Sequence, residues 1–289
     1  MQFNFKKIKF SYEVKKKEWV GNGFYVHGLL RPTLELNKYI SPFILMDYAS
    51  PMVFEKSKNT RGVGEHPHRG FETVTFAYQG EIEHRDSSGG GGVIKSGDIQ
   101  WMTAGKGIVH DEFHSKKFTQ TGGIFEMVQL WINLPKKFKM TNPKYQEIQK
   151  KNIPSCIIGN ETKLRIIAGE YLGKKGPAST YTEVNIYDIN SKYGEDIKLK
   201  FKVGSNTIIL IMKGDILINN KKYQDQYVLI FGREFENIHF KVSKDFKGLI
   251  LNGDPIDEPI EAYGPFVMNT KQEINEAISD FQNGKMGRL

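Results

Sequence analysis

Short runs of β-branched and aromatic residues, separated by Gly and Pro, mark the first half of the chain. They occur at residues 23–27, 43–47, 73–78, 93–99 and 123–127. Short strands at regular spacing, with turn residues between them, are typical of a β-sandwich or a β-barrel. We therefore expect a first β-rich unit at residues 1–134.

A polar segment separates this unit from a second series of apolar runs. Residues 135–152 are rich in Lys, Pro, Asn and Gln and have no regular apolar spacing, which predicts a linker. Beyond it, strand-like runs resume at residues 164–168, 182–187, 207–212, 216–218 and 227–231. These runs predict a second β-rich unit at residues 153–289.

The two units share an internal repeat. Residues 73–82 (TVTFAYQGEI) align without a gap with residues 207–216 (TIILIMKGDI), so that Gly80 and Gly214 coincide. Self-similarity of this kind indicates that one structural unit occurs twice. The sequence therefore predicts a duplicated β-barrel.

The C-terminal tail has a different period. Thr270 and Glu273 have capping-box spacing, and four apolar residues follow at helical spacing, namely Ile274, Ala277, Ile278 and Phe281. We expect one amphipathic helix whose apolar stripe packs against a barrel wall.

Composition and charge narrow the function classes. Cys156 is the only cysteine, which excludes an intrachain disulfide and favours a reducing, cytoplasmic compartment. No apolar run approaches the roughly twenty residues of a membrane-spanning helix, so no membrane association is expected. The net charge of +8 is spread over short lysine clusters, and direct binding of nucleic acid is therefore not expected.

Two pairs of metal-binding residue types stand out in the first unit. His66 and His68 are two residues apart, as are His110 and Glu112, so each pair shares one face of an extended strand. If a barrel brings the two strands together, three nitrogens and one oxygen can hold a single divalent metal ion. Such a set leaves coordination positions open, which suits Fe(II) and also accepts Mn, Ni, Co or Zn.

Other polar residues near these pairs leave alternatives open. Glu72 follows His68 by four residues and is the rival of Glu112 as the carboxylate ligand. His84 and Asp86 flank Arg85 on one strand, but nothing in the sequence pairs them with the other four residues.

The repeat also makes a prediction about the second unit. Counting back equally from Gly80 and Gly214 places Lys200 and Lys202 at the positions of His66 and His68. Protonated lysines repel a cation, so the second barrel is expected to be free of metal.

Several segments resemble the signature segments of the pirin family. They are residues 66–74 (HPHRGFETV), 97–105 (GDIQWMTAG), 107–110 (GIVH) and 264–270 (GPFVMNT). The resemblance spans most of the chain and is weakest in the second unit. It implies an all-β fold of two antiparallel jelly-roll (cupin) barrels, with one iron ion bound only in the first barrel by His66, His68, His110 and Glu112.

The resemblance also implies two classes of function. Some pirins are similar to flavonol dioxygenases that cleave quercetin with O2, and others act as iron-dependent partners of transcription factors. We expect an enzyme acting on a small aromatic substrate and O2, with Glu112 as the catalytic base. The aromatic residues Phe76, Tyr78, Trp101 and Phe125 are the expected walls. The alternative is a redox-sensing regulator that binds a protein partner.

Overall fold

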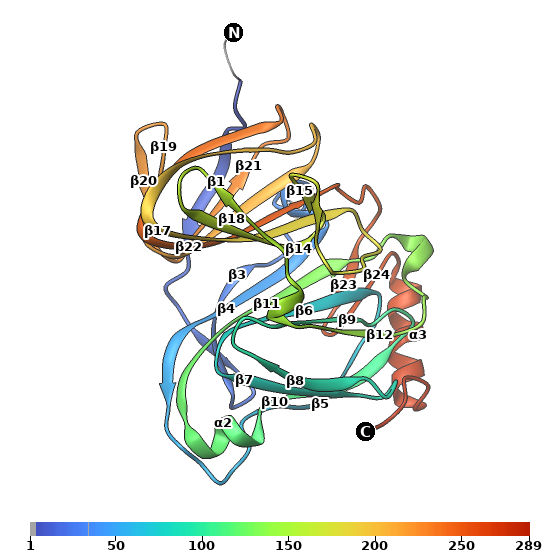
Figure 1. Cartoon of the computed structure of the whole chain (residues 1–289). Coiled ribbons are helices and arrows are strands. Elements are labelled where there is room, and N and C mark those ends of the chain that lie inside the picture. The colour runs from blue at the N-terminus through green and yellow to red at the C-terminus, as the bar shows by residue number, and fades with distance from the viewer. Residues whose placement is uncertain (1–3, 34) are drawn as a thin grey trace. The chain divides into compact units, whose positions relative to one another are not determined.

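The computed structural model describes residues 4–33 and 35–289 (Figure 1). Within this part of the chain, almost all regular structure is β-strand in antiparallel ladders, which confirms the all-β prediction. The chain divides into two compact units. We call Lys16–Arg31, Phe43–Lys150 and Ile256–Leu289 the first barrel, and the remaining described residues the second barrel.

The first barrel consists of two main antiparallel sheets (Figure 1). The four-stranded sheet has the order β5-β10-β7-β8, with bounds Gly62–His68, Ile108–His114, Glu81–Asp86 and Gly91–Lys95. The seven-stranded sheet has the order β12-β9-β6-β11-β4-β3-β2, with bounds Lys144–Ile148, Ile99–Thr103, Phe71–Gln79, Gly123–Asn133, Phe43–Phe54, Phe24–Leu30 and Glu18–Val20. The short elements α2 (Lys116–Thr121), η1 (Lys136–Phe138), β23 (Glu261–Tyr263) and β24 (Phe266–Met268) complete it, and η2 (Lys150–Asn152) follows β12.

The second barrel is built from one coiled sheet. Its main order is β1-β21-β18-β22-β17-β14-β13, with bounds Ile8–Glu13, Tyr227–Phe231, Asn206–Lys213, Asn237–Gly253, Val184–Lys200, Thr162–Ala168 and Ser155–Ile158. Strands β19 (Ile216–Ile218) and β20 (Lys221–Tyr223) join it at β22, and α1 (Asn37–Ile40), β15 (Glu170–Tyr171) and β16 (Lys174–Lys175) are peripheral. Inward-facing aliphatic and aromatic side chains of these strands form one large buried core.

The internal repeat corresponds to equivalent strands. The first copy forms β6, between β9 and β11, and the second forms β18, between β21 and β22. Each strand is followed by a glycine with positive φ, 86° at Gly80 and 83° at Gly214. This left-handed conformation favours glycine, which explains why both copies retain it.

Strand β1 and the C-terminal helix each belong to a different barrel from the one predicted from the sequence. Strand β1 pairs with β21 and so belongs to the second barrel, although it was expected in the first. Helix α3 (Lys271–Gln282) belongs to the first barrel, where Ile274 and Ala277 pack with Val109 of β10. Its N-cap is confirmed, because the Thr270 hydroxyl accepts a hydrogen bond of 3.2 Å from the Glu273 amide.

Two shorter segments also differ from the sequence-based expectation. Residues 135–152 contain strand β12, which pairs with β9 along its whole length, so this segment as far as Lys150 is part of the first barrel. The run at residues 93–99 is interrupted by a turn at Gly97, where φ is 92°, and contributes to both β8 and β9. No helix in the described residues is long and apolar enough to cross a membrane.

Candidate metal centre

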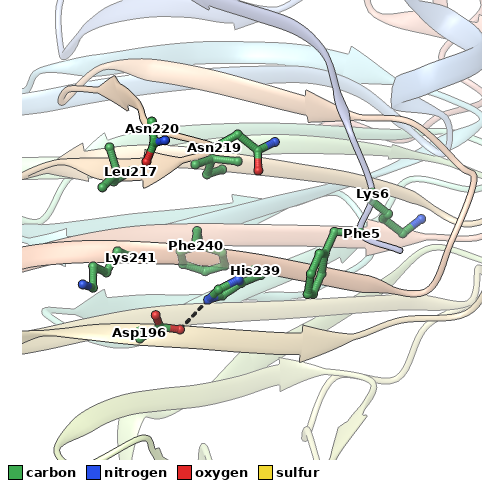
Figure 2. Close-up of a pocket in the computed structure, with 10 residues that line it drawn as sticks. Phe5, Lys6, Asp196, Leu217, Asn219, Asn220, His239, Phe240 and Lys241 are labelled. Carbon is green, nitrogen blue, oxygen red and sulfur yellow. Dashed lines mark hydrogen bonds and ion pairs between the residues drawn. The ribbon is translucent and has the colours of Figure 1, made fainter. Parts of the chain in front are cut away.

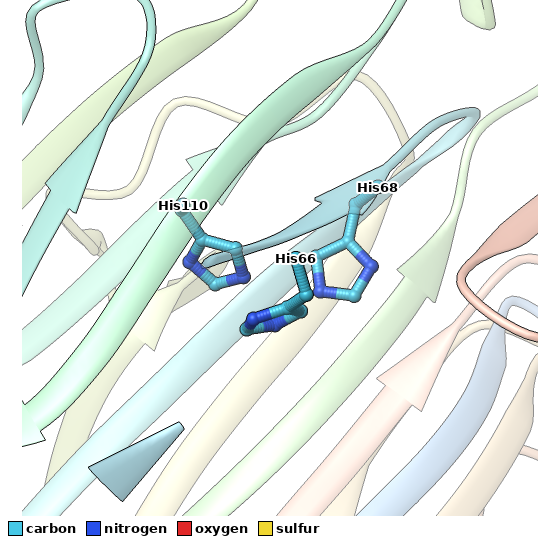
Figure 3. A group of neighbouring side chains, drawn as sticks. All are labelled: His66, His68 and His110. Atoms are coloured by element: carbon cyan, nitrogen blue, oxygen red, sulfur yellow. The ribbon is translucent and has the colours of Figure 1, made fainter. Parts of the chain in front are cut away.

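Strand pairing brings the two histidine-containing segments together. Strands β5 and β10 are antiparallel neighbours in which His66 lies opposite His110, and His68 lies opposite Ile108. One ring nitrogen from each of His66, His68 and His110 lies within 4.8 Å of the others. Figure 3 shows the three rings turned toward a common space.

The hydrogen bonds of the three rings leave one nitrogen of each available. His66 Nδ1 lies 2.8 Å from the Gly64 carbonyl oxygen, and His68 Nδ1 lies 3.3 Å from the Pro265 carbonyl oxygen. When Nδ1 carries the donated proton, Nε2 keeps its lone pair. His110 Nε2 is buried and has no hydrogen-bond partner among the described residues. A buried, unpartnered acceptor is unusual, and a cation bound to this nitrogen would satisfy it.

Burial favours the neutral form of the two innermost histidines. It lowers the pKa of His110 well below its usual value, and the neighbouring histidines lower it further. The pKa of His68 is likewise lowered well below its usual value, mainly by burial. Because neutral imidazole is the form that binds a metal ion, these residues fit a divalent cation.

Glu112 lies in the same space. One of its carboxylate oxygens lies within 4.8 Å of ring nitrogens of His84 and His110, and the side chain lines one pocket together with His66 and His68. Its Oε1 accepts a hydrogen bond from Gln100 Nε2 (2.5 Å) and lies 3.2 Å from the Thr75 hydroxyl, whose single proton has a shorter contact of 2.6 Å with Gln129 Oε1. The structure thus brings His66, His68 and His110 together and places Glu112 beside His110, with Glu112 oriented by its neighbours.

Glu72, the rival carboxylate, lies elsewhere. Glu72 and Thr75 are three residues apart on β6, so their side chains point to opposite faces of that strand. Thr75 is the one that faces Glu112. Glu72 Oε1 accepts a hydrogen bond of 2.6 Å from the Thr103 hydroxyl. Burial raises the pKa of Glu72 to about 7. Neither group of neighbouring ligand types in the described residues includes it.

A pocket of about 410 Å³ opens onto His66, His68 and Glu112. Its other walls are mainly apolar, and two polar side chains, Asp47 and Gln129, are among them; the apolar ones include Phe24, Val26, Leu45, Met127 and Trp131. None of the expected wall residues Phe76, Tyr78, Trp101 and Phe125 lines this pocket. Trp101 shows the reason, because it neighbours Gln100 on β9 and must point away from Glu112.

His84 and Asp86 join the centre from strand β7, a connection that the sequence did not predict. His84 Nδ1 lies 3.3 Å from His110 Nδ1, and His84 Nε2 lies 3.1 Å from Asp86 Oδ2. Burial alone raises the pKa of Asp86, but hydrogen bonds from His84, Ser88 and Gly90 outweigh this effect and lower it. The i, i+2 spacing of His84 and Asp86 was the available signal, and the pairing of β7 with β10 was the missing information.

The turn after His68 is held by a buried ammonium group. Lys139 Nζ donates to the carbonyl oxygens of Gly70 and Val267, at 2.8 Å each, and to Asn133 Oδ1 at 2.7 Å. At Gly70, φ is 89°, and an added Cβ atom would lie 2.0 Å from the Val267 carbonyl oxygen. The close approach of these backbone segments therefore requires glycine at this position.

In the second barrel, the residues aligned with His66 and His68 are exposed lysines in ion pairs. Lys200 pairs with Glu236 at 3.2 Å, and Lys202 pairs with Asp254. A pocket of about 310 Å³ in this barrel contains one histidine and one carboxylate in contact, His239 and Asp196, at 2.5 Å (Figure 2). A metal-free second barrel remains a prediction.

Comparisons with known proteins cover both barrels. A family model described as Pirin matches residues 25–132, and one described as Pirin C-terminal cupin domain matches residues 186–287. A protein from Pseudomonas aeruginosa named as a putative quercetin 2,3-dioxygenase is 43% identical, over 98% of this chain and 99% of its own length. Pirin from Rattus norvegicus is 34% identical, over 86% of this chain and 84% of its own.

Solved structures give the same picture. A quercetin 2,3-dioxygenase from Acinetobacter baumannii is 48% identical and superimposes with a TM-score of 0.94, covering 98% of this chain and 99% of that chain. A bacterial pirin from Escherichia coli, solved in complex with nickel(II), has a TM-score of 0.65 at 19% identity, covering 86% of this chain and 99% of its own. The second similarity concerns the fold alone.

Proposed function

The chain belongs to the pirin family, and from that premise we propose that it is a metal-dependent dioxygenase that opens the ring of a flavonol such as quercetin, or of a similar enolic or phenolic substrate. The observation that carries the proposal is the unpartnered, buried Nε2 of His110, in a residue whose ring lies close to two further imidazoles, His66 and His68, and to the carboxylate of Glu112. The similarity to proteins named as quercetin 2,3-dioxygenases supports the substrate class.

His66, His68, His110 and Glu112 are the proposed ligands of one divalent ion, with Fe(II) as our first choice and Mn, Ni, Co or Zn as the others. Three imidazoles and one carboxylate suit such ions and leave coordination positions open. When bound, the ion supplies Lewis acidity toward a substrate hydroxyl and a means of reacting with O2.

The pocket walls suit a planar substrate. Phe24 and Trp131 offer aromatic surface, and the surrounding aliphatic side chains add apolar contact area. Asp47 and Gln129 are cross-strand neighbours on β4 and β11 and place two polar groups on one wall. We propose that these two groups bind ring hydroxyls and so orient the substrate.

Glu112 is the proposed catalytic base. Gln100 donates to its Oε1, so Oε2 is the oxygen that would hold the ion or, when released from it, accept the proton of the reacting enolic hydroxyl. The hydrogen bond to the carboxylate and its position in the pocket support this role.

Anaerobic loading with Fe(II), followed by quercetin and then O2, tests the activity. We expect loss of quercetin absorbance together with stoichiometric consumption of O2. Glu112→Gln keeps the size of the side chain but is a much weaker base, and we expect its turnover to fall by about 10²- to 10⁴-fold.

Loaded protein that neither bleaches quercetin nor consumes O2 with a panel of phenolic substrates contradicts the enzyme proposal. The remaining candidate is then a regulator that senses the redox state of iron. It predicts that ferrous and ferric protein recover different protein partners.

We also propose a cytoplasmic location, because a chain with a single cysteine cannot form an intrachain disulfide.

A further inference from the structure

Three buried side chains form a continuous hydrogen-bonded series that ends at the metal centre. Asp86 Oδ2 lies 3.1 Å from His84 Nε2, and His84 Nδ1 lies 3.3 Å from His110 Nδ1. The side chains of His84 and Asp86 are completely buried, and His110 is 0% exposed. No solvent is available to replace a lost partner in this series.

The series has a direction, because its first member can only accept hydrogen bonds. An ionised Asp86 requires His84 to donate from Nε2, and the neutral His84 ring then has a lone pair at Nδ1. His110 must donate from its own Nδ1 to that lone pair. The remaining nitrogen of His110, Nε2, is therefore the one without a proton.

We propose that Asp86 and His84 are positioning residues that fix the tautomer and ring orientation of His110, so that its Nε2 presents a lone pair to the metal ion. The proposal rests on the proposed metal centre, because the bound ion is what makes the tautomer matter. Histidine ligands are commonly oriented in this way by an acceptor at the second ring nitrogen.

The surroundings of Asp86 keep the series pointing in one direction. Its other oxygen, Oδ1, accepts three hydrogen bonds, from the Ser88 amide (2.9 Å), the Ser88 hydroxyl (2.6 Å) and the Gly90 amide (3.0 Å). An aromatic side chain holds the next member, since Tyr145 of β12 stacks on His84 at 4.9 Å between ring centroids. Neither Asp86 nor His84 can turn away without losing these contacts.

His84 could be regarded as a ligand itself, because one of its nitrogens lies near His110 and Glu112. Both of its ring nitrogens, however, already face a partner, Asp86 on one side and His110 on the other. A positioning role for His84 accounts for both observations.

The substitution Asp86→Asn tests the direction of the series. The three donors around Oδ1 hold the amide oxygen of the new side chain in that position, so its NH2 group faces His84. His84 must then accept at Nε2 and donate from Nδ1, and His110 must accept at Nδ1. The proton of His110 moves to Nε2, where the metal ion would bind.

We would measure the tautomer of His110 in metal-free, ¹⁵N-labelled protein, since ¹⁵N chemical shifts distinguish protonated from unprotonated ring nitrogens. We expect the Nδ1–H form in the unsubstituted protein and the Nε2–H form in Asp86→Asn. The affinity for Ni²⁺, measured by competition with a chelator, should fall by about 10- to 100-fold in the variant.

Asp111→Asn is the matched control. Asp111 follows His110 on β10, but its carboxylate pairs with the exposed Arg85 instead of with the series. The control removes the same charge near the centre, and it should leave the His110 tautomer unchanged and the Ni²⁺ affinity within about threefold. Equal losses of affinity in the two variants, or an unchanged His110 tautomer in Asp86→Asn, would overturn the proposal.

A second pair of variants covers the case in which Asp86→Asn fails to fold. His84→Asn retains an acceptor near the position of Nδ1, whereas His84→Leu has a similar shape and no acceptor. We expect the Asn variant to keep the Nδ1–H form of His110, and the Leu variant to lose it. Identical behaviour of this pair contradicts the proposal.

The two readouts separate this inference from the proposed function. A tautomer that switches in protein that binds no Ni²⁺ supports the hydrogen-bonded series and rejects the metal centre. Tight Ni²⁺ binding that is unaffected by Asp86→Asn, with an unchanged tautomer, rejects the series and retains the metal centre.

Discussion

Glu72 carries a proton that controls the stability of the first barrel. Its side chain is 0% exposed, and burial raises its pKa from 4.5 to about 7, against a smaller opposing effect of the Thr103 hydroxyl. The folded chain therefore keeps this proton up to about pH 7, whereas the unfolded chain releases it near 4.5. The stabilisation is complete below 4.5 and is lost as the pH rises through about 7.

The shift sets the magnitude of the effect. At about 1.4 kcal/mol for each pKa unit, a change from 4.5 to about 7 corresponds to about 3 kcal/mol of unfolding free energy. About three quarters of it falls between about pH 5 and pH 8. Glu72→Gln removes the titrating group. The unfolding free energy of the original protein minus that of the variant should therefore fall by about 2 to 3 kcal/mol as the pH rises over this range.

Urea unfolding of metal-free protein, followed by tryptophan fluorescence, measures this difference. Trp19, Trp101 and Trp131 are the three tryptophans of the chain, and all three lie in the first barrel. Glu55→Gln, at an exposed position, is the control. A difference between original and Glu72→Gln protein that stays constant from about pH 5 to pH 8 would refute the reasoning, whatever its absolute value.

Two further predictions concern the metal centre and its support. The double variant His66→Ala, His110→Ala should contain about zero metal ions per chain, compared with about one in the original protein. Elemental analysis after anaerobic purification measures this content. Two ions per chain in the original protein would contradict a metal-free second barrel. Lys139→Met keeps the apolar stem of the side chain but leaves the Gly70 and Val267 carbonyl oxygens without their buried donor. We expect the free energy of unfolding, measured with urea, to fall by about 2 to 3 kcal/mol. An unchanged urea midpoint would exclude this role.

The four proposed ligands could be found from the sequence because their arrangement is local. Residues two apart on a strand share a face, so His66 with His68, and His110 with Glu112, were recognisable without any knowledge of tertiary structure. The contribution of His84 was not recognisable in the same way. It depends on the antiparallel pairing of β7 with β10, and the register of two strands far apart in the chain is not written in either strand alone.

The wall of the pocket shows a second limit of sequence reasoning. Trp101 is aromatic and lies within a family-like segment, yet its neighbour Gln100 is the residue that faces Glu112. Choosing between the two requires knowing which face of β9 is turned inward, and both faces of this strand are buried. Residue type alone could not separate a pocket residue from a core residue here.

The polar segment at residues 135–152 failed as a linker prediction for a related reason. Strand β12 lies at the edge of its sheet, and Ile148 is its only buried residue, so its composition resembles that of a loop. Even so, Tyr145 within it stacks on His84. A short edge strand with few apolar residues gives too weak a periodic signal to be recognised.

The exchange of terminal segments between the two barrels has a consequence for biosynthesis. Strand β1 is synthesised long before its partner β21, and the first barrel is incomplete until Ile256–Leu289 has been made. The carbonyl group of Pro265 that orients His68 belongs to this last portion. The nascent chain therefore cannot assemble a finished ion-binding pocket before residues 256–289 have been made, and neither barrel corresponds to one continuous segment of the chain.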